Sequence, residues 1–312
     1  MLLEDLLTKP AHSIINQSFD SRLRLDMRNP VNGDGFGVGY YSSNKPCIFK
    51  AITPAWNNVN LNNLSQCTKS NLVFGHVRAS TQGVLAETNC HPFFYGKIMF
   101  MHNGGISKFE RIKKKLINHI EDKFFLIIQG STDSECCFAL FLDTLYKMNY
   151  DPEDTTVTFT HQILYKALLK TIGLIKDWQR EVTDEPSLLN FAITDGDNVV
   201  VSRYITSRVD EAASLHFSSG SKFYEYQPGL FRMERLDRSQ DVIMIASEPL
   251  TFERNDWMSV PTNTIIVVSK SGSVLMYPIM DEFYGNDDRS VALAWSKGLI
   301  GGVPRPNELM AA

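Results

Sequence analysis

Apolar positions along the 312-residue chain recur with two different spacings, which predict two kinds of element. A three-to-four-residue spacing, typical of a helix with one buried face, recurs in four segments. We predict helices over Glu4–Asn16, Lys108–Glu121, Ser134–Met148 and Phe159–Arg180. Short apolar runs bounded by turn residues predict strands. These are Gly35–Tyr41, Cys47–Ile52, Leu72–His76, Lys97–His102, Leu188–Thr194, Val199–Tyr204, Val242–Ala246, Asn263–Ser269 and Val274–Pro278.

The connections between these strands indicate antiparallel sheets. Turn residues fill Asp195–Asn198 and Lys270–Ser273, and such short links join antiparallel strands, since parallel pairs need crossovers of about a dozen residues or more. Strands come first, then a helical block, then strands again, which predicts an α+β fold of layered sheets with helices outside. We predict one domain over residues 1–280 and a loosely packed tail over 281–312, where Gly, Asn, Asp and Pro accumulate.

Bulk composition narrows the class of protein without naming a function. The formal charge of −4 is spread along the chain, so we expect no nucleic-acid partner. No apolar run reaches the ~18–20 residues of a membrane span, and Met1–Leu7 does not resemble a secretory signal. The five cysteines are scattered and odd in number, which favours a reducing compartment, and we expect a cytoplasmic protein.

Polar residues gather at the ends of four predicted elements, where a rigid scaffold usually presents binding groups. The segments are Asn32–Gly37, His76–Gly83, His102–Gly105 and Gly130–Glu135. Each also has a purely structural interpretation. Ser131 or Thr132 can cap a helix, and Asn103-Gly104 is the strongest short hairpin signal. We expect Asn103-Gly104 to be both a turn and a pair of hydrogen-bond donors.

Taken together, these segments predict a pocket of definite chemistry. Arg78 can grip a carboxylate with two hydrogen bonds, and Asp133 can receive an ammonium group. The Asn103 amide and the Gly104 N–H can stabilise an oxyanion. Glutamine or a γ-glutamyl compound satisfies all three. His76, Cys90, His91 and His102 match no common zinc spacing, so we expect neither a metal nor a cofactor.

These residues carry a resemblance to a known family. Arg78-Ala79-Ser80-Thr81, His102-Asn103-Gly104 and Ser131-Thr132-Asp133 resemble the signature segments of class II glutamine amidotransferases. The similarity extends over nearly the whole chain, including Thr88–Pro92 and Ala246–Arg254, and is closest to a fungal amidotransferase-like subunit of a glutathione-degrading complex.

The resemblance implies a fold, an activity and roles for residues. The fold is the αββα sandwich of two antiparallel sheets found in N-terminal-nucleophile hydrolases. The activity is cleavage of the γ-glutamyl bond of glutathione together with a metallopeptidase-like partner, to which any metal belongs. Arg78 and Asp133 would bind the glutamyl end, Asn103 and Gly104 would form the oxyanion hole, and Thr81 would lie in the same pocket. Asn32 and Asp34 would lie near the nucleophile.

The sequence departs from this family at the nucleophile. The family uses a cysteine at residue one, whose own α-amino group acts as the base. This chain begins Met1-Leu2-Leu3, and Cys90, the nearest look-alike, is internal. We expect the chain as given to be inactive alone and its start to be internal, with the first strand and the cysteine omitted. Two alternatives stay open: a non-catalytic scaffold subunit that binds γ-glutamyl ligands, and a hydrolase of another γ-glutamyl compound.

Overall fold

The computed structural model describes residues 1–21, 31–79, 84–154, 156–236 and 241–285. The helices in these ranges are α1 (Glu4–Leu7), α2 (Ile14–Gln17), η1 (Ala55–Asn57), α3 (Val59–Cys67), η2 (Glu87–Asn89), α4 (Phe109–His119), α5 (Asp122–Phe125), α6 (Asp133–Lys147), α7 (His161–Arg180) and η3 (Arg254–Asp256). The strands are β1 (Phe36–Tyr41), β2 (Pro46–Ala51), β3 (Val73–Val77), β4 (Phe93–Tyr95), β5 (Ile98–Gly105), β6 (Leu188–Thr194), β7 (Val199–Arg203), β8 (His216–Gly220), β9 (Lys222–Gln227), β10 (Leu230–Glu234), β11 (Val242–Ala246), β12 (Met258–Ser259), β13 (Thr264–Val268) and β14 (Val274–Pro278).

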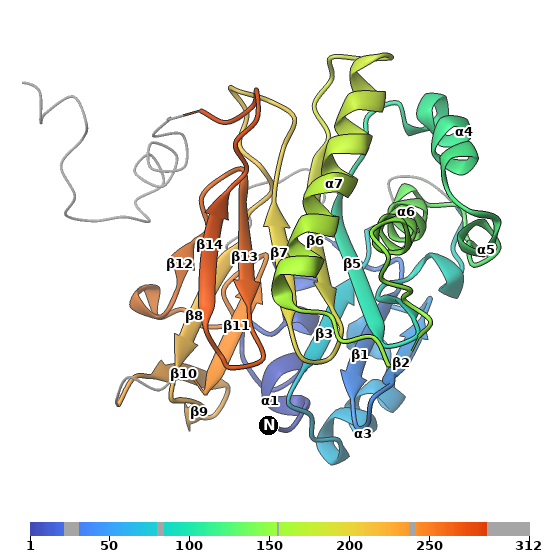
Figure 1. The fold of residues 1–312 in the computed structure, drawn as a ribbon. Coiled ribbons are helices and arrows are strands. Elements are labelled where there is room, and N and C mark those ends of the chain that lie inside the picture. Colours follow the sequence, from blue (N-terminus) through green and yellow to red (C-terminus); the bar gives the residue numbers. More distant parts are fainter. Residues whose placement is uncertain (22–30, 80–83, 155, 237–240, 286–312) are drawn as a thin grey trace, which may run out of the picture.

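A six-stranded antiparallel sheet with the order β14-β13-β7-β6-β5-β4 forms the centre of the molecule. Helices α4, α6 and α7 cover one of its faces (Figure 1). Phe100 of β5 packs there on Phe138 of α6 and Phe191 of β6, with ring centroids 5.4 and 5.2 Å apart. Burial of such apolar surface, about 25 cal/mol per Å², is the main force that holds the helices on the sheet.

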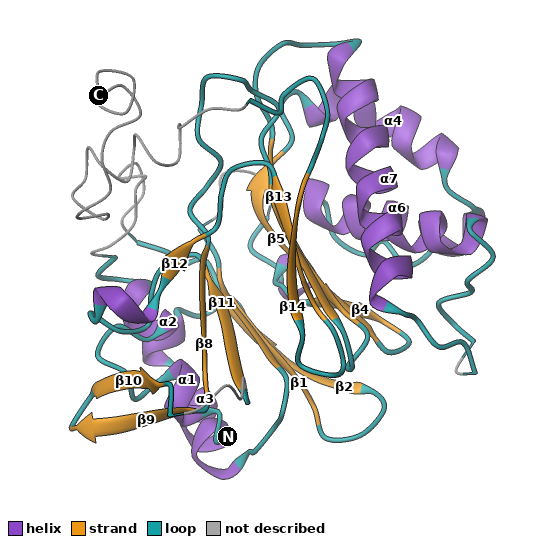
Figure 2. Cartoon of the chain, turned by 60° about the vertical axis from the view of Figure 1, so that its left-hand side comes forward, coloured by secondary structure: helices purple, strands orange, loops and turns teal. Residues whose placement is uncertain are grey.

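A second sheet layer lies against the other face and is itself covered by α1, α2 and α3 (Figure 2). It consists of the three-stranded sheets β2-β1-β3 and β11-β8-β12. In β1, Phe36, Val38 and Tyr40 face the helices, as the two-residue period of a strand requires. The alternate position Gly39 faces β5 so closely that a Cβ there would lie 2.5 Å from Met99 Sδ. The two layers therefore approach closely at this point.

The fold is the predicted α+β sandwich, with four layers in the order helices, sheet, sheet, helices. Both hairpin predictions are confirmed, because β6 pairs with β7 and β13 with β14. The helix predicted over Glu4–Asn16 is wrong. It divides into α1 and α2, because Pro10 lacks an N–H and Ser13 caps a new helix by accepting a hydrogen bond from Asn16 N.

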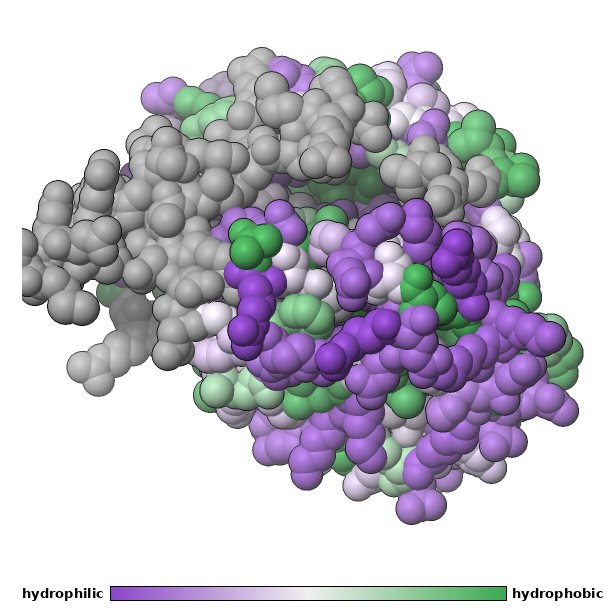
Figure 3. Space-filling model, turned by 90° about the horizontal axis from the view of Figure 1, so that it is seen from above, coloured by the Kyte–Doolittle hydropathy of each residue, from purple (hydrophilic) through white to green (hydrophobic). Residues whose placement is uncertain are grey.

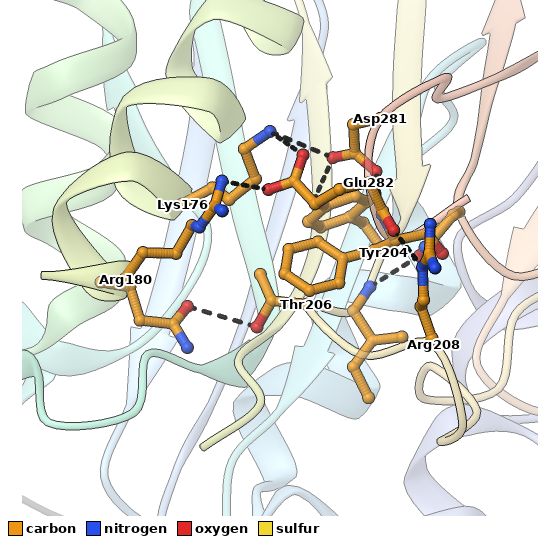
Figure 4. A network of polar contacts seen from close by, with 11 residues as sticks. Lys176, Arg180, Tyr204, Thr206, Arg208, Asp281 and Glu282 are labelled. Atoms are coloured by element: carbon orange, nitrogen blue, oxygen red, sulfur yellow. Dashed lines mark hydrogen bonds and ion pairs between the residues drawn. The ribbon is translucent and has the colours of Figure 1, made fainter. Parts of the chain in front are cut away.

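The described part of the segment predicted as a tail, residues 281–285, contacts the sandwich. Asp281 accepts a hydrogen bond from Tyr204 Oη (2.6 Å), and Glu282 lies 2.9 Å from Lys176 Nζ and 2.7 Å from Arg180 Nη1 (Figure 4). We call Tyr204, Lys176, Arg180, Asp281 and Glu282 the C-terminal clamp. Residues 286–312 lie outside the described part, so the boundary at residue 280 stays a prediction.

None of the helices in the described ranges is both long and apolar enough to cross a membrane. Seen from above, the described atoms of the surface are mainly hydrophilic, with apolar side chains in small separate groups (Figure 3).

Candidate active site

Asn103 and Gly104 lie within β5 and not in a hairpin turn, which corrects the turn prediction. They pair with Asn190 and Leu189 of β6. Gly104 has φ +149°, and a Cβ there would lie 2.0 Å from Leu188 O. Glycine is required at this position because any side chain would push the two strands apart. The Asn-Gly pair thus reflects a close strand contact rather than a turn.

The start of α6 brings Asp133 to the end of β5. Thr132 caps the helix by accepting a hydrogen bond from Glu135 N (3.3 Å), as one of the two predicted caps. Asp133 Oδ2 then accepts a hydrogen bond from Ile106 N (2.9 Å), one residue beyond β5. Asp133 Oδ1 accepts one from Ser134 N (2.8 Å). The carboxylate is therefore fixed beside the strand that carries Asn103 and Gly104.

Arg78 follows β3 directly and is 5% exposed. Its backbone extends the pairing of β1 with β3, since Arg78 N donates to Gly35 O (2.9 Å) and Asp34 N donates to Arg78 O (3.0 Å). Asn32 lies two residues before Asp34, and its N–H donates to Ser18 O (2.6 Å). The loop with Asn32 and Asp34 is thus joined to the Arg78 backbone through Asp34 and Gly35. Thr81 lies outside the described residues.

Three buried histidines connect the ends of β3 and β5. The rings of His76 and His91 have centroids 4.2 Å apart. Burial, the nearby His102 and the Arg78 guanidinium lower the pKa of His76 to about 4, opposed by a hydrogen bond to the His102 backbone. Burial also lowers the pKa of His91, and His76, His102 and Arg78 add to the effect. Burial lowers the pKa of His102 as well, while the Asp133 charge opposes it.

The charges that shift these pKa values indicate which of the predicted residues lie near one another. The Arg78 charge acts on His76, His76 on His102, and His102 on Asp133, so all four belong to one connected cluster at the ends of β3 and β5. Asn103 is next to His102 in β5. A cation, a carboxylate and an amide thus stand in one region that links the two sheets, rather than on separate faces.

Neither a cysteine nucleophile nor a metal centre is formed by the described residues of this cluster. Cys90 is fully buried, and burial raises the pKa of its thiol, although Arg78 and Lys50 oppose the shift. Its Sγ lies 3.7 Å from both Ala51 O and Ala86 O. Across the described ranges, no group of three or more His, Cys, Asp or Glu side chains is placed to hold a metal ion.

One contact of the cluster was missed by the sequence analysis. The Asn103 amide donates a hydrogen bond from Nδ2 to Ser247 Oγ (3.1 Å). Ser247 directly follows β11. A polar residue at the end of a strand is the pattern by which the other segments were identified, so the same pattern could have indicated Ser247. Ser247 thereby ties the loop after β11 to the candidate oxyanion donor.

Comparison with known proteins identifies the family over almost the full length of the chain. Residues 5–283 match the family model for class II glutamine amidotransferases. The chain is 63% identical over 316 residues to the probable glutamine amidotransferase DUG3 of Saccharomyces cerevisiae, covering 97% of this chain and 88% of the yeast protein. It is 24% identical over 156 residues to the gamma-glutamyl-hercynylcysteine sulfoxide hydrolase of Mycobacterium tuberculosis, covering 50% of this chain and 60% of that hydrolase.

Solved structures agree in fold. A glutamine aminotransferase class-II domain protein from Silicibacter pomeroyi aligns with a TM-score of 0.57 and 22% identity, over 79% of this chain and 92% of that one. The glutamine phosphoribosylpyrophosphate amidotransferase of Bacillus subtilis aligns with a TM-score of 0.52 and 16% identity, over 88% of this chain and 48% of that one. The family model and the yeast relative, which extend over almost the full length, decide the assignment: this chain belongs to the class II glutamine amidotransferase family.

Proposed function

We propose that this protein is a cysteine-dependent amidohydrolase that cleaves the γ-glutamyl bond of glutathione. The observation that carries the proposal is the cluster that joins Arg78, Asp133 and Asn103 through buried histidines. An α-carboxylate, an α-ammonium and a side-chain carbonyl are the three groups that such a cluster complements. The choice of glutathione rests on the resemblance of the sequence to the fungal glutathione-degrading branch.

In the proposed reaction, Arg78 binds the α-carboxylate and Asp133 the α-ammonium of the glutamyl group, with Thr81 in the same pocket. A cysteine thiolate attacks the γ-carbonyl carbon, and the carbonyl oxygen becomes an oxyanion that the Asn103 amide and the Gly104 N–H stabilise. The C–N bond then breaks, and cysteinylglycine leaves with the proton that the nucleophile's α-amino group had taken up. Water hydrolyses the thioester and releases glutamate. Asn32 and Asp34 would line the approach of the nucleophile.

We further propose that the protein works in the cytoplasm with a metallopeptidase-like subunit, which would take the released dipeptide. A metal would then act in the partner. Small γ-glutamyl molecules would be the substrates that this chain binds.

A non-catalytic scaffold subunit is the second candidate, and one observation favours it. Cys90, the cysteine of the described cluster, is buried and its thiol has a raised pKa, so it is a poor nucleophile. The scaffold would still bind γ-glutamyl ligands. A third candidate is hydrolysis of another γ-glutamyl compound, suggested by the name of the mycobacterial relative.

The test uses the complex purified from its native source, with the N-terminal residue of this subunit read by mass spectrometry. Glutathione is added, and release of glutamate and cysteinylglycine is followed. We expect equal amounts of both products, and we expect Asn103→Ala to lower kcat about 10²–10³-fold. Asn62→Ala, on the exposed side of α3, is the matched control and should leave kcat unchanged.

Two results would contradict the proposal. Unchanged turnover in Asn103→Ala would remove the oxyanion role. Continued breakdown of glutathione after the nucleophilic cysteine is replaced by alanine would leave the scaffold candidate. A panel that contains glutathione, glutamine and other γ-glutamyl compounds decides the substrate, because the enzyme should show its highest kcat/KM with glutathione.

A further inference from the structure

A chain of hydrogen-bonding groups lies behind Asp133. Ser134 Oγ is 2.9 Å from His102 Nδ1 and 3.3 Å from Asp133 Oδ1. On the far side of the ring, His102 Nε2 is 2.9 Å from Leu188 O. His102 and Ser134 are 2% and 6% exposed, so water does not replace these contacts. This series of groups therefore runs from the backbone carbonyl of Leu188, at the start of β6, to the carboxylate at the start of α6.

The direction of each hydrogen bond in this chain follows from its fixed end. Leu188 O can only accept, so His102 Nε2 carries a hydrogen. Burial lowers the pKa of His102, which keeps the ring neutral at physiological pH and leaves Nδ1 as an acceptor. The single hydroxyl hydrogen of Ser134 is then donated to Nδ1. Ser134 Oγ consequently turns a lone pair, and not a hydrogen, toward Asp133.

The direction of the Ser134 hydroxyl determines how many acceptor positions of the Asp133 carboxylate stay free for a ligand. Asp133 Oδ1 accepts only the Ser134 N–H and Oδ2 only the Ile106 N–H among the donors so far described. An ionised carboxylate has about four acceptor sites, so positions remain for an incoming cation. If the Ser134 hydroxyl pointed at Oδ1, it would occupy one of them and weaken the field there.

We propose that His102 and Ser134 are positioning residues that hold the Ser134 hydroxyl hydrogen away from Asp133 and so keep its carboxylate available to the α-ammonium of the substrate. The inference rests on the role of Asp133 in the proposed function. It also has a consequence in acid. A protonated His102 donates from both nitrogens, so the Ser134 hydroxyl turns to Asp133 Oδ1 and competes with the ligand.

The surroundings of His102 fix the sign of this dependence. The groups that face it are Asp133 from α6, His76 from β3 and His91 from the segment before β4, together with the Phe191 ring of β6 at 4.7 Å. Burial, the largest effect, lowers the pKa of His102 from its ordinary 6.5, and Asp133 partly opposes this. The arrangement that favours binding therefore persists at neutral pH and reverses only as the solution becomes acidic.

The test compares KM for glutathione with KM for its des-amino analogue, glutaryl-cysteinylglycine, from about pH 8 down to the lowest pH at which the complex stays folded. In the native complex, KM for glutathione should rise about tenfold at the acid end, the worth of one hydrogen bond to a charged group. KM for the analogue, which has no ammonium, should not rise. Ser134→Ala should abolish the acid rise, because the hydroxyl that competes with the ligand for Asp133 is removed.

Control variants distinguish this positioning role of His102 and Ser134 from a merely structural role. Thr144→Val removes another buried hydroxyl of α6, bonded to Leu140 O (2.8 Å), and should keep the acid rise. Ser134→Cys keeps the approximate size of the side chain with a weak donor, and should reduce the rise if Ser134→Ala does not fold. Thermal unfolding at each pH shows that the folded protein is being compared.

The outcomes distinguish failure of the inference from failure of the proposed function. Asp133→Asn should raise KM for glutathione and not for the des-amino analogue. If Asp133→Asn affects both substrates equally, the assigned role of Asp133 is wrong. If Asp133→Asn discriminates but Ser134→Ala keeps the full acid rise, the positioning role of His102 and Ser134 is overturned.

Discussion

The two faces of β5 and β6 differ in what they bury. Toward α6 and α7, the sheet packs against rings such as Phe138 and Phe141, and the buried hydroxyl of Thr144 is bonded within its own helix. Toward β1 and β3, it meets His76 and His91, whose rings carry buried nitrogens without a hydrogen-bond partner in the described structure. The first face is built for stability.

The second face keeps polar groups that lower stability. A buried polar atom without a partner costs about 1–3 kcal/mol, so an apolar contact would be more favourable there. These unpartnered nitrogens lie beside the cluster that contains Arg78, Asp133 and Asn103. Perturbed ionisable groups of this kind concentrate at functional sites. The difference between the faces thus points to the same region as the sequence motifs, without depending on any motif.

Replacing one glycine in each region should give the largest difference in stability: Gly104 lies in β5 beside the polar cluster, and Gly173 lies in α7 on the apolar face. Gly104→Ala should destabilise the protein by about 2–6 kcal/mol, because backbone strain and overpacking against Leu188 O each contribute about 1–3 kcal/mol. Gly173→Ala in α7, where a Cβ meets nothing within 4 Å, should stabilise by about 0.5–1 kcal/mol. Urea unfolding of both variants measures the difference, and equal midpoints would remove the contrast.

Replacement of a partnerless histidine should have an intermediate effect. We expect His91→Leu to stabilise the protein by about 1–3 kcal/mol at neutral pH, because neither of its buried ring nitrogens has a hydrogen-bond partner among the described residues. Thermal unfolding of the variant and the natural chain measures this. A lower melting temperature in the variant would mean that His91 has a stabilising partner.

The same variant should change the dependence of stability on pH. A histidine whose folded pKa lies below its unfolded value of 6.5 binds more protons when unfolded, so stability falls as the pH drops below 6.5. For His76, whose folded pKa is about 4, the fall continues down to that pH. His91→Leu should flatten the slope in this range. The other histidines with lowered pKa values still contribute, namely His76, His102, His119 and His216. Parallel curves for both proteins would contradict the pKa shift of His91.

The C-terminal clamp should give the smallest effect, since its ion pairs are partly exposed. Glu282→Gln should cost about 0.5–1 kcal/mol, because Lys176 and Arg180 both contact this carboxylate (Figure 4). Glu181→Gln is the matched control: its pair with Lys115 is exposed on both sides and should contribute nothing measurable. Urea unfolding in low and high salt measures the free energy of unfolding of both variants. Equal losses of stability in the two variants would mean that the C-terminal clamp contributes no more than an exposed surface ion pair.

Sequence patterns were reliable where local preference and burial agree. The apolar run of β13 and the turn residues at Asp195–Asn198 led to correct strands and hairpins. They were unreliable where distant contacts decide the structure. Helix α3 has only two buried positions, Leu61 and Ser65, so no apolar face revealed it. Asn103-Gly104 looks like a turn, and only the pairing with β6 shows why glycine is needed.

For the site, the sequence identified residues but not their connections. The capping role of Thr132 was among the alternatives, since a cap depends on neighbours in the chain. The contacts of Asp133 with Ile106, of Asn103 with Ser247 and of His102 with Ser134 join residues 27, 144 and 32 positions apart. No local pattern encodes such pairs. The roles assigned to Arg78, Thr81, Asp133, Asn103 and Gly104 stay predictions.

The central claim, a single pocket for a glutamyl group, is tested most directly by calorimetric titration of the native complex with three ligands. Glutamate carries both the α-carboxylate and the α-ammonium, glutarate lacks the ammonium, and 4-aminobutyrate lacks the α-carboxylate. We predict that glutamate binds most tightly, that Asp133→Asn removes its advantage over glutarate, and that Arg78→Met removes its advantage over 4-aminobutyrate. Equal affinity for all three ligands in the unaltered protein would contradict the account.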